Sequence, residues 1–157
     1  MPVQDSDRSK KLIMNNRKAR FEFEIVDTIE AGIVLQGTEV KSLRAGKVNM
    51  QDAYAVFPNK ENDELFIIGM HISPYEQGNR ENHDPLRKRK LLVHQREAVR
   101  LRSAVQEKGL TIVPLELYFS GPYIKVLLGV ARGKKLHDKR EATKERDVKR
   151  ELQRMKF

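Results

Sequence analysis

Apolar and polar residues alternate near the start of the chain and predict a first strand. In RFEFEIV, the side chains of Phe21, Phe23 and Ile25 fall on one face and two glutamates on the other. This period of two is typical of a half-buried strand. The polar segment DTIEAG interrupts the pattern, and AGIVLQG (residues 31–37) then gives a second apolar run with glycines at its limits. Together the two runs predict a β-hairpin.

The following segments predict a short helix and two more strands. In TEVKSLRAGK, Thr38 is suited to be an N-cap and Gly46 to end a helix. DAYAVF and ELFIIGMHI have the composition of strands, and PNKEND between them has that of a turn. Residues 73–85 are polar and are expected to form a loop.

The apolar spacing becomes helical in LRKRKLLVHQREAVRLRSAVQEKG. Ala98, Leu101 and Val105 recur at i, i+3 and i+7, and Gly109 suits the position after a helix. We therefore expect an amphipathic helix in this segment. LTIVPLELYF and YIKVLLGVA then predict a last pair of strands around the turn SGP, and Pro114 indicates a sheet edge or a bulge in the first of them.

About six short strands and two helices predict a mainly β fold, either a small barrel or a sandwich. Among small barrels that bind polyanions, the OB type is the natural candidate. We expect a flexible N-terminal segment (residues 1–15), an OB-type β-barrel with flanking helices (residues 16–132) and a basic C-terminal tail (residues 133–157).

Charge adds a functional indication. The net charge is +9, and the tail carries ten Lys and Arg against five Asp and Glu. Such a balance indicates nucleic acid or an acidic membrane surface as partner, with a solubilising surface charge as the alternative. There is no cysteine, the four histidines lack metal-ligand spacing, and no segment is apolar enough for a signal peptide or a membrane span. We expect a cytoplasmic protein without metal, cofactor or membrane contact.

Motifs of catalysis are absent from the sequence. GVARGKK differs from a phosphate-binding loop, because three residues instead of four separate its glycines and no Ser or Thr follows the lysine. No G-x-S-x-G segment occurs. An active site needs no local motif, so these absences do not exclude an enzyme, but the sequence gives no positive sign of one. A nuclease acting on RNA stays an alternative.

Basic residues gather in three clusters, NRKAR (Asn16–Arg20), LRKRK (residues 86–90) and the tail. Each alone is also typical of a solvated surface, but three around one β-rich core favour phosphate binding. Aromatic residues make up only 6% and tryptophan is absent. Recognition of a folded RNA by shape and phosphate therefore suits the composition better than single-strand binding by rows of stacking rings.

Four segments in order, NRKARFEFEI, EAGIVLQGTEVKSLRAGKVNMQDAY, DPLRKRKLLVHQRE and GVARGKKLHDKR, resemble the SsrA-binding protein (SmpB) family. The resemblance runs from about residue 16 to 140 and into the basic tail. It implies an OB-type barrel that binds the tRNA-like domain of transfer-messenger RNA and delivers this RNA to stalled ribosomes in trans-translation. It further implies elongation factor Tu and alanyl-tRNA synthetase as pathway partners through the RNA, and no catalysis.

The resemblance and the basic clusters together give the expected RNA-binding residues of the barrel. They are Asn16, Arg17, Lys18, Arg20, Phe23, Glu30, Gln36, Gly37, Glu39, Lys41, Ser42, Arg44, Gly46, Lys47, Arg87, Arg89, Lys90 and Lys125. Glu30 would accept hydrogen bonds from the RNA or orient a neighbouring cation, or it is simply a carboxylate at a strand end. Phe23 would stack or pack.

The resemblance also implies that the tail enters the decoding centre and the message channel of the ribosome. The expected tail residues are Gly133, Lys134, Lys135, His137, Asp138, Lys139, Arg140, Lys144, Arg146, Lys149 and Arg150. Val148, Leu152 and Met155 form a thin apolar stripe, so we expect the tail to be disordered when free and helical on the ribosome. A general ribosome-associated OB protein stays an alternative.

Overall fold

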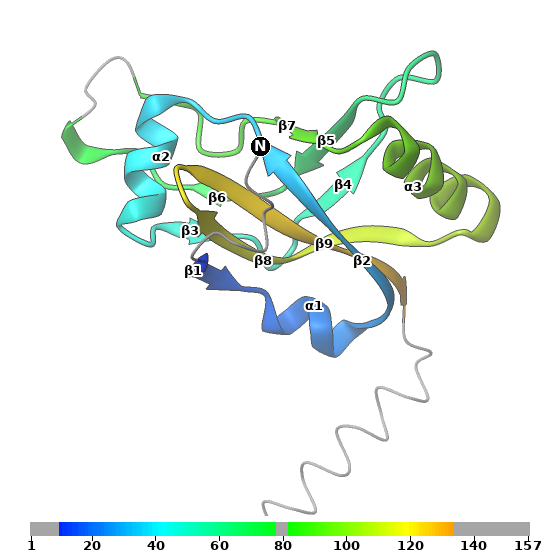
Figure 1. The fold of residues 1–157 in the computed structure, drawn as a ribbon. Coiled ribbons are helices and arrows are strands. Elements are labelled where there is room, and N and C mark those ends of the chain that lie inside the picture. The colour runs from blue at the N-terminus through cyan, green and yellow to red at the C-terminus, as the bar shows by residue number, and fades with distance from the viewer. Residues whose placement is uncertain (1–9, 78–81, 134–157) are drawn as a thin grey trace, which may run out of the picture.

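A computed structural model describes residues 10–77 and 82–133 and shows a mainly β fold with three helices in this part of the chain (Figure 1). The strands are β1 (Lys10–Asn15), β2 (Phe23–Ile33), β3 (Val48–Asn49), β4 (Tyr54–Val56), β5 (Leu65–Ile68), β6 (His71–Ile72), β7 (Arg89–Leu92), β8 (Thr111–Ser120) and β9 (Tyr123–Gly133). The helices are α1 (Arg17–Glu22), α2 (Gly37–Arg44) and α3 (Gln95–Lys108).

Six antiparallel strands close into a ring. The order in the main sheet is β1-β8-β4-β5-β7-β2-β9, and β9 also pairs with β8. The ring therefore runs β8-β4-β5-β7-β2-β9 and back to β8, with β1 added to the outer edge of β8. Strands β3 and β6 form a separate pair.

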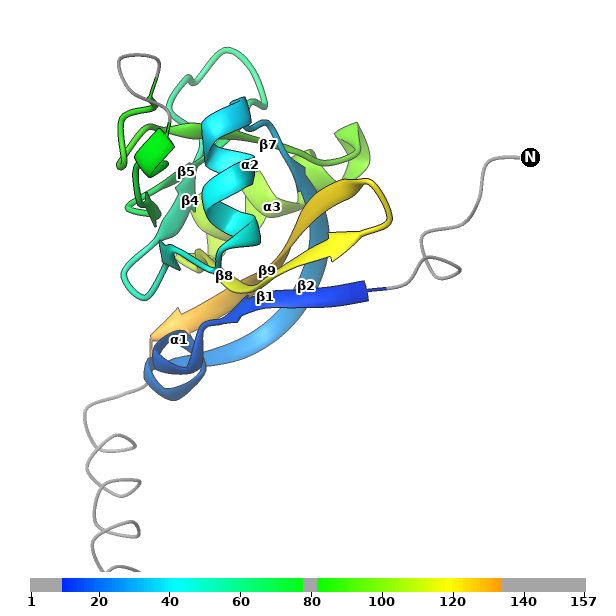
Figure 2. The same cartoon turned by 90° about the vertical axis from the view of Figure 1, so that its left-hand side faces the viewer.

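Helices α2 and α3 cover opposite ends of the ring (Figures 1 and 2). Leu43 of α2 and Leu101 of α3 are each 1% exposed, and both belong to the same apolar cluster as Ile67, Leu117 and Leu128 of the ring. Burial of these side chains is the main favourable term in folding. The ring is thus filled by one core that a helix closes at each end.

Strands β8 and β9 form the longest hairpin and confirm the last predicted strand pair. Their turn contains Gly121, whose φ of 57° favours glycine. A bulge between Pro114 and Glu116 agrees with the prediction for Pro114. An added Cβ at Gly129 would meet Leu115 Cδ1 at 2.8 Å, so any larger residue there requires the buried Leu115 side chain to shift.

The predictions for the N-terminal part need three corrections. Phe21 lies in α1, not in the first strand, and DTIEAG does not break β2, which continues to Ile33 with a bulge between Ile25 and Asp27. Pairing with β9 along nearly all of β2 satisfies the backbone of these polar residues, so no hairpin forms. Residues 10–15 were expected to be flexible but form β1, since Ile13 and Met14 pack against the core.

The middle of the chain needs three corrections. The helix predicted from residue 86 begins only at Gln95, and β7 precedes it. Arg89 and Leu91 point inward and alternate with less buried neighbours. The sequence does not show this period of two as an apolar pattern, because one of the inward residues is an arginine. ELFIIGMHI is divided into β5 and β6 at Gly69, whose φ is 80°. The prediction of a short helix is confirmed by α2, although Gln36 and not Thr38 is its N-cap.

A buried ionic cluster of Glu39, Arg87 and Arg89 joins α2 to β7. Glu39 and Arg89 are each 0% exposed, and the Arg89 Nε donates to the Glu39 carboxylate. Arg87 Nη2 donates to Glu39 Oε1 at 2.6 Å, and the backbone N–H of Gln36 donates to the same oxygen at 2.7 Å. Arg89 Nη1 also donates to the Met70 carbonyl at 2.7 Å. The cluster therefore fixes the first turn of α2 on the ring.

The Glu39 carboxyl is ionised in this cluster. Burial by itself raises its pKa, but hydrogen bonds from Arg87, the Gln36 backbone and Arg89 outweigh burial and lower the pKa below its usual value. The group thus contributes stability above the pKa of an unfolded glutamate, and this contribution is lost as the pH falls through the folded-state pKa.

We expect Glu39→Gln to destabilise the fold by about 3–5 kcal/mol, because it leaves the buried Arg89 without a counter-charge while keeping the side-chain size. Urea unfolding measures the change. Glu64→Gln is the matched control, since Glu64 pairs with Lys90 at 3.6 Å on the surface and such pairs contribute about 0–1 kcal/mol. Equal effects of the two substitutions would contradict the structural role of the cluster.

Candidate nucleic-acid interface

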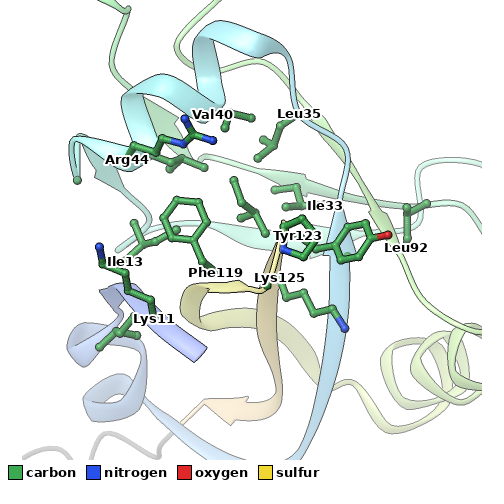
Figure 3. A pocket seen from close by; sticks show the side chains of 17 residues that line it. Lys11, Ile13, Ile33, Leu35, Val40, Arg44, Leu92, Phe119, Tyr123 and Lys125 are labelled. Carbon is green, nitrogen blue, oxygen red and sulfur yellow. The ribbon is translucent and has the colours of Figure 1, made fainter. Parts of the chain in front are cut away.

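A groove of about 750 Å³ opens where β1, α2, the end of β2 and the tip of the β8–β9 hairpin meet (Figure 3). Its lining includes the cations Lys11, Arg44 and Lys125 and no acidic residue among the described ones. Phosphates are attracted to such a surface because Lys and Arg neutralise them and release their counterions. The groove is therefore the candidate site for a polyanion.

The rest of the groove lining is mostly apolar. Figure 3 shows Phe119 and Tyr123 of the hairpin on one side, with Val40 and Arg44 of α2 across from them. Tyr123 is 55% exposed and so remains accessible from solvent. The groove thus combines cationic and aromatic groups.

Glu30 lies beside the groove in a small polar cluster. The Tyr118 hydroxyl donates to its carboxylate, and Lys125 Nζ donates to Glu30 Oε1 at 3.0 Å. Lys10 Nζ is 3.7 Å from Glu30 Oε2 and 5.1 Å from the centre of the Tyr118 ring. Partial burial by itself raises the Glu30 pKa, but the hydrogen bonds from Tyr118 and Lys125 and the two lysine charges lower it. Glu30 is ionised and accepts a hydrogen bond from Lys125, and it lies within β2 instead of at the strand end.

Four of the predicted RNA-binding residues lie inside the fold, which corrects their expected place at the surface. Asn16, Glu39, Ser42 and Arg89 are each at most 1% exposed. Asn16 caps α1 and donates to the carbonyls of Met50 and Pro114, both at 2.9 Å. Ser42 Oγ donates to the Ser73 carbonyl at 2.7 Å. Their polar groups are occupied, so these side chains position α1 and α2.

The cations of α1 remain on the surface. Lys18 Nζ is 2.5 Å from Asp52, and Arg20 is 3.4 Å from Glu116. Arg17 is exposed. Phe23 instead packs against a small second core with Ala19, so its ring serves packing in this structure.

Six of the predicted RNA-binding residues around α2 are exposed. They are Gln36, Gly37, Lys41, Arg44, Gly46 and Lys47. Lys41 Nζ lies 5.2 Å from the centre of the Tyr75 ring, and Lys47 is 3.5 Å from Glu76. Of this set, Arg44 and Gly46 line the groove. Arg87 and Lys90 are instead directed to Glu39 and Glu64.

Sequence reasoning missed the contributions of β1 and of the hairpin tip. Lys11 was assigned to a flexible segment, and Phe119 and Tyr123 were read only as strand residues. The apolar triplet Leu12-Ile13-Met14 was the available signal for β1. The grouping of the two rings in this groove had no local signal, because the groove forms only where the β8–β9 hairpin tip meets β1 and α2.

Gly133 is exposed at the end of β9. The other predicted tail residues lie outside the described ones. They are Lys134, Lys135, His137, Asp138, Lys139, Arg140, Lys144, Arg146, Lys149 and Arg150. Within residues 10–77 and 82–133, no three His, Asp or Glu side chains gather as metal ligands, and no helix there has the length and apolar character to cross a membrane.

Comparisons with known proteins agree on one family. The family model described as SmpB protein matches residues 13–156. The SsrA-binding protein of Acetivibrio thermocellus is 58% identical over 92% of both chains, and that of Staphylococcus aureus strain Newman is 56% identical over 94% of both. A solved structure described as "tmRNA-SmpB: a journey to the center of the bacterial ribosome" has a TM-score of 0.67 and 53% identity, covering 83% of this chain and 93% of its own. The chain belongs to the SmpB protein family.

Proposed function

We propose that this chain is the RNA-binding adaptor of trans-translation. It binds the tRNA-like domain of transfer-messenger RNA and delivers this RNA to stalled ribosomes, so that incomplete proteins are tagged. The observation that carries the proposal is the 58% identity, over nearly the whole chain, to a relative described as an SsrA-binding protein. The described similar structure associates transfer-messenger RNA and SmpB with the bacterial ribosome. The chain acts as a binding protein and not as an enzyme.

In this proposal the closed ring is an OB-type barrel, and its cationic groove faces the RNA. The closed antiparallel ring and the helix at its end support the barrel assignment. Lys11, Arg44 and Lys125 supply phosphate contacts, and Glu30 holds Lys125 in place. Elongation factor Tu and alanyl-tRNA synthetase act on the same RNA, and the complex works in the cytoplasm.

The tail has a separate role in this proposal. Residues 134–157 follow β9 directly and enter the decoding centre and message channel of the small subunit. The basic residues there face ribosomal RNA, and His137 stacks on a base. The high positive charge of this segment supports contact with RNA.

We expect the purified chain to bind the tRNA-like domain with saturation and to prefer it over bulk tRNA in a competition assay. Affinity should fall about 10³-fold or more from 50 to 200 mM salt if roughly six phosphates are contacted. Equal affinity for any RNA would favour a general ribosome-associated protein. Cleavage of the RNA in the presence of Mg²⁺ would favour a nuclease.

Arg44→Ala should weaken binding of the same RNA and reduce the slope of log affinity against log salt by about 0.9, because one phosphate contact is lost. Titrations at several salt concentrations measure this slope. Lys60→Ala is the matched control, since Lys60 is an exposed cation of the β4–β5 turn outside the groove. The groove assignment fails if both substitutions have the same effect on the slope.

A chain that ends at Gly133 should keep most of its affinity for the tRNA-like domain, because the ring and groove are complete. It should lose tagging in a reconstituted translation reaction on messages without a stop codon. If the truncation instead removes RNA affinity, the tail is an electrostatic anchor and the two-part division is wrong.

A further inference from the structure

His83 is a buried histidine of the β6–β7 loop and lies between β6 and α2. Its side chain is 5% exposed. Its Nε2 is 2.8 Å from the carbonyl oxygen of Ile72 in β6, and its Nδ1 is 2.8 Å from the hydroxyl oxygen of Thr38 in α2. A carbonyl only accepts hydrogen bonds, so Nε2 carries the hydrogen and Nδ1 of the neutral ring accepts from the Thr38 hydroxyl. His83 therefore ties the β6–β7 loop to the first turn of α2.

Asn82, the residue before His83, holds the backbone of Tyr75. Its Oδ1 accepts from the Tyr75 backbone N–H at 2.9 Å, and its Nδ2 donates to the Tyr75 carbonyl at 2.5 Å. Both described parts of the loop are thereby joined, and the part that carries Tyr75 lies beside α2 (Figures 1 and 2). His83 thus anchors the far end of the loop, and Tyr75 with it, to α2.

Tyr75 in turn contacts a cation of α2. Lys41 Nζ lies 5.2 Å from the centre of the Tyr75 ring, which is within the range of a cation–π interaction. Thr38 and Lys41 are three residues apart in α2, so they lie on the same face of the helix. The loop therefore contacts this face at two points, at Thr38 through His83 and at Lys41 through Tyr75.

The contact with a ring leaves the charge of Lys41 available. Lys41 is exposed, lies outside the lining of the cationic groove and, among the described residues, forms no ion pair. Lys47 differs, since its ammonium is 3.5 Å from the Glu76 carboxylate of the same loop. An aromatic ring holds an ammonium group without cancelling its charge. Lys41 is thus both held in place and free to neutralise an anion.

We propose that His83 is a positioning residue for RNA binding. By holding the loop on α2 it keeps Tyr75 beside the Lys41 ammonium, and Lys41 contacts a phosphate of the RNA outside the groove. A free lysine side chain loses rotamer freedom when it binds, and its prior orientation by Tyr75 reduces this cost. The inference rests on the proposed function and adds one phosphate contact and the residues that orient it.

The test measures the affinity of the full chain for the tRNA-like domain of transfer-messenger RNA at several salt concentrations. Lys41→Ala should reduce the slope of log affinity against log salt by about 0.9, because one phosphate contact is lost. Tyr75→Leu removes the ring and should lower affinity about two- to fivefold.

The hydrogen bond to His83 is tested from the side of Thr38, because replacement of the buried histidine itself would also break its contact with Ile72. Thr38→Val removes the hydroxyl and keeps the side-chain shape, and it should lower affinity about two- to fivefold. Thr38→Ser keeps the hydroxyl and should retain the affinity of the unaltered chain.

A double-mutant cycle separates positioning of Lys41 from a general loss of structure. In the Lys41→Ala background, Thr38→Val and Tyr75→Leu should have no further effect on affinity, because they act on the RNA through Lys41. Thr111→Val is the matched control, since Thr111 is a half-buried threonine at the start of β8, outside α2 and the loop, and it should leave affinity unchanged. Thermal unfolding checks that each variant is folded at the temperature of the titrations.

Three results would overturn the inference. In the first, Lys41→Ala leaves the salt slope unchanged. In the second, Thr38→Val has no effect, or it lowers affinity as much in the Lys41→Ala background as it does alone. In the third, Thr38→Ser loses as much affinity as Thr38→Val. If the unaltered chain shows no preference for the tRNA-like domain over bulk tRNA, the proposed function itself fails.

Discussion

The buried charge of Glu39 constrains the side of the molecule that carries the groove. An ionised carboxylate in the interior is tolerated only when it is paired and hydrogen-bonded. Arg89 of β7, Arg87 and the Gln36 backbone N–H together supply the hydrogen bonds and the counter-charge that the Glu39 carboxylate requires. These contacts fix α2 in a single position on the ring. Because α2 is held at its first turn, Arg44 at its last turn reaches the groove. A costly interior charge is thus coupled to the position of a surface cation.

The second constraint is the double pairing of β9 with β8 and β2. It brings Glu30 of β2 within hydrogen-bonding distance of Lys125 of β9 and Tyr118 of β8, and Lys10 of β1 completes the polar cluster. The same hairpin carries Tyr123 at its tip toward α2. A change of register by one residue would turn these side chains to the other face. Ring closure therefore specifies both the polar cluster and the groove.

Local patterns predicted what depends on local physics. The short helix around Val40 and the β8–β9 strand pair follow from apolar spacing and turn residues, and both are present. The same rules failed at Arg89, because a sequence pattern assigns an arginine to the surface. Its burial depends on pairing with Glu39, fifty residues away. The composition favoured shape and phosphate over stacking, and it could not show that Phe119 and Tyr123 meet in one groove. Tertiary contacts between distant segments account for each of these differences.

The proposed groove separates two contributions to RNA affinity by their dependence on salt. Contacts between Lys or Arg and phosphate weaken as salt rises, because release of the same counterions into a more concentrated solution gains less entropy. Contact of a ligand with apolar lining residues such as Tyr123 would bury apolar surface, and this term does not decline with added salt. At high salt the remaining affinity is then governed by the apolar lining. Cations alone would hold any polyanion, whereas apolar groups between the cations favour a ligand that also presents apolar surface.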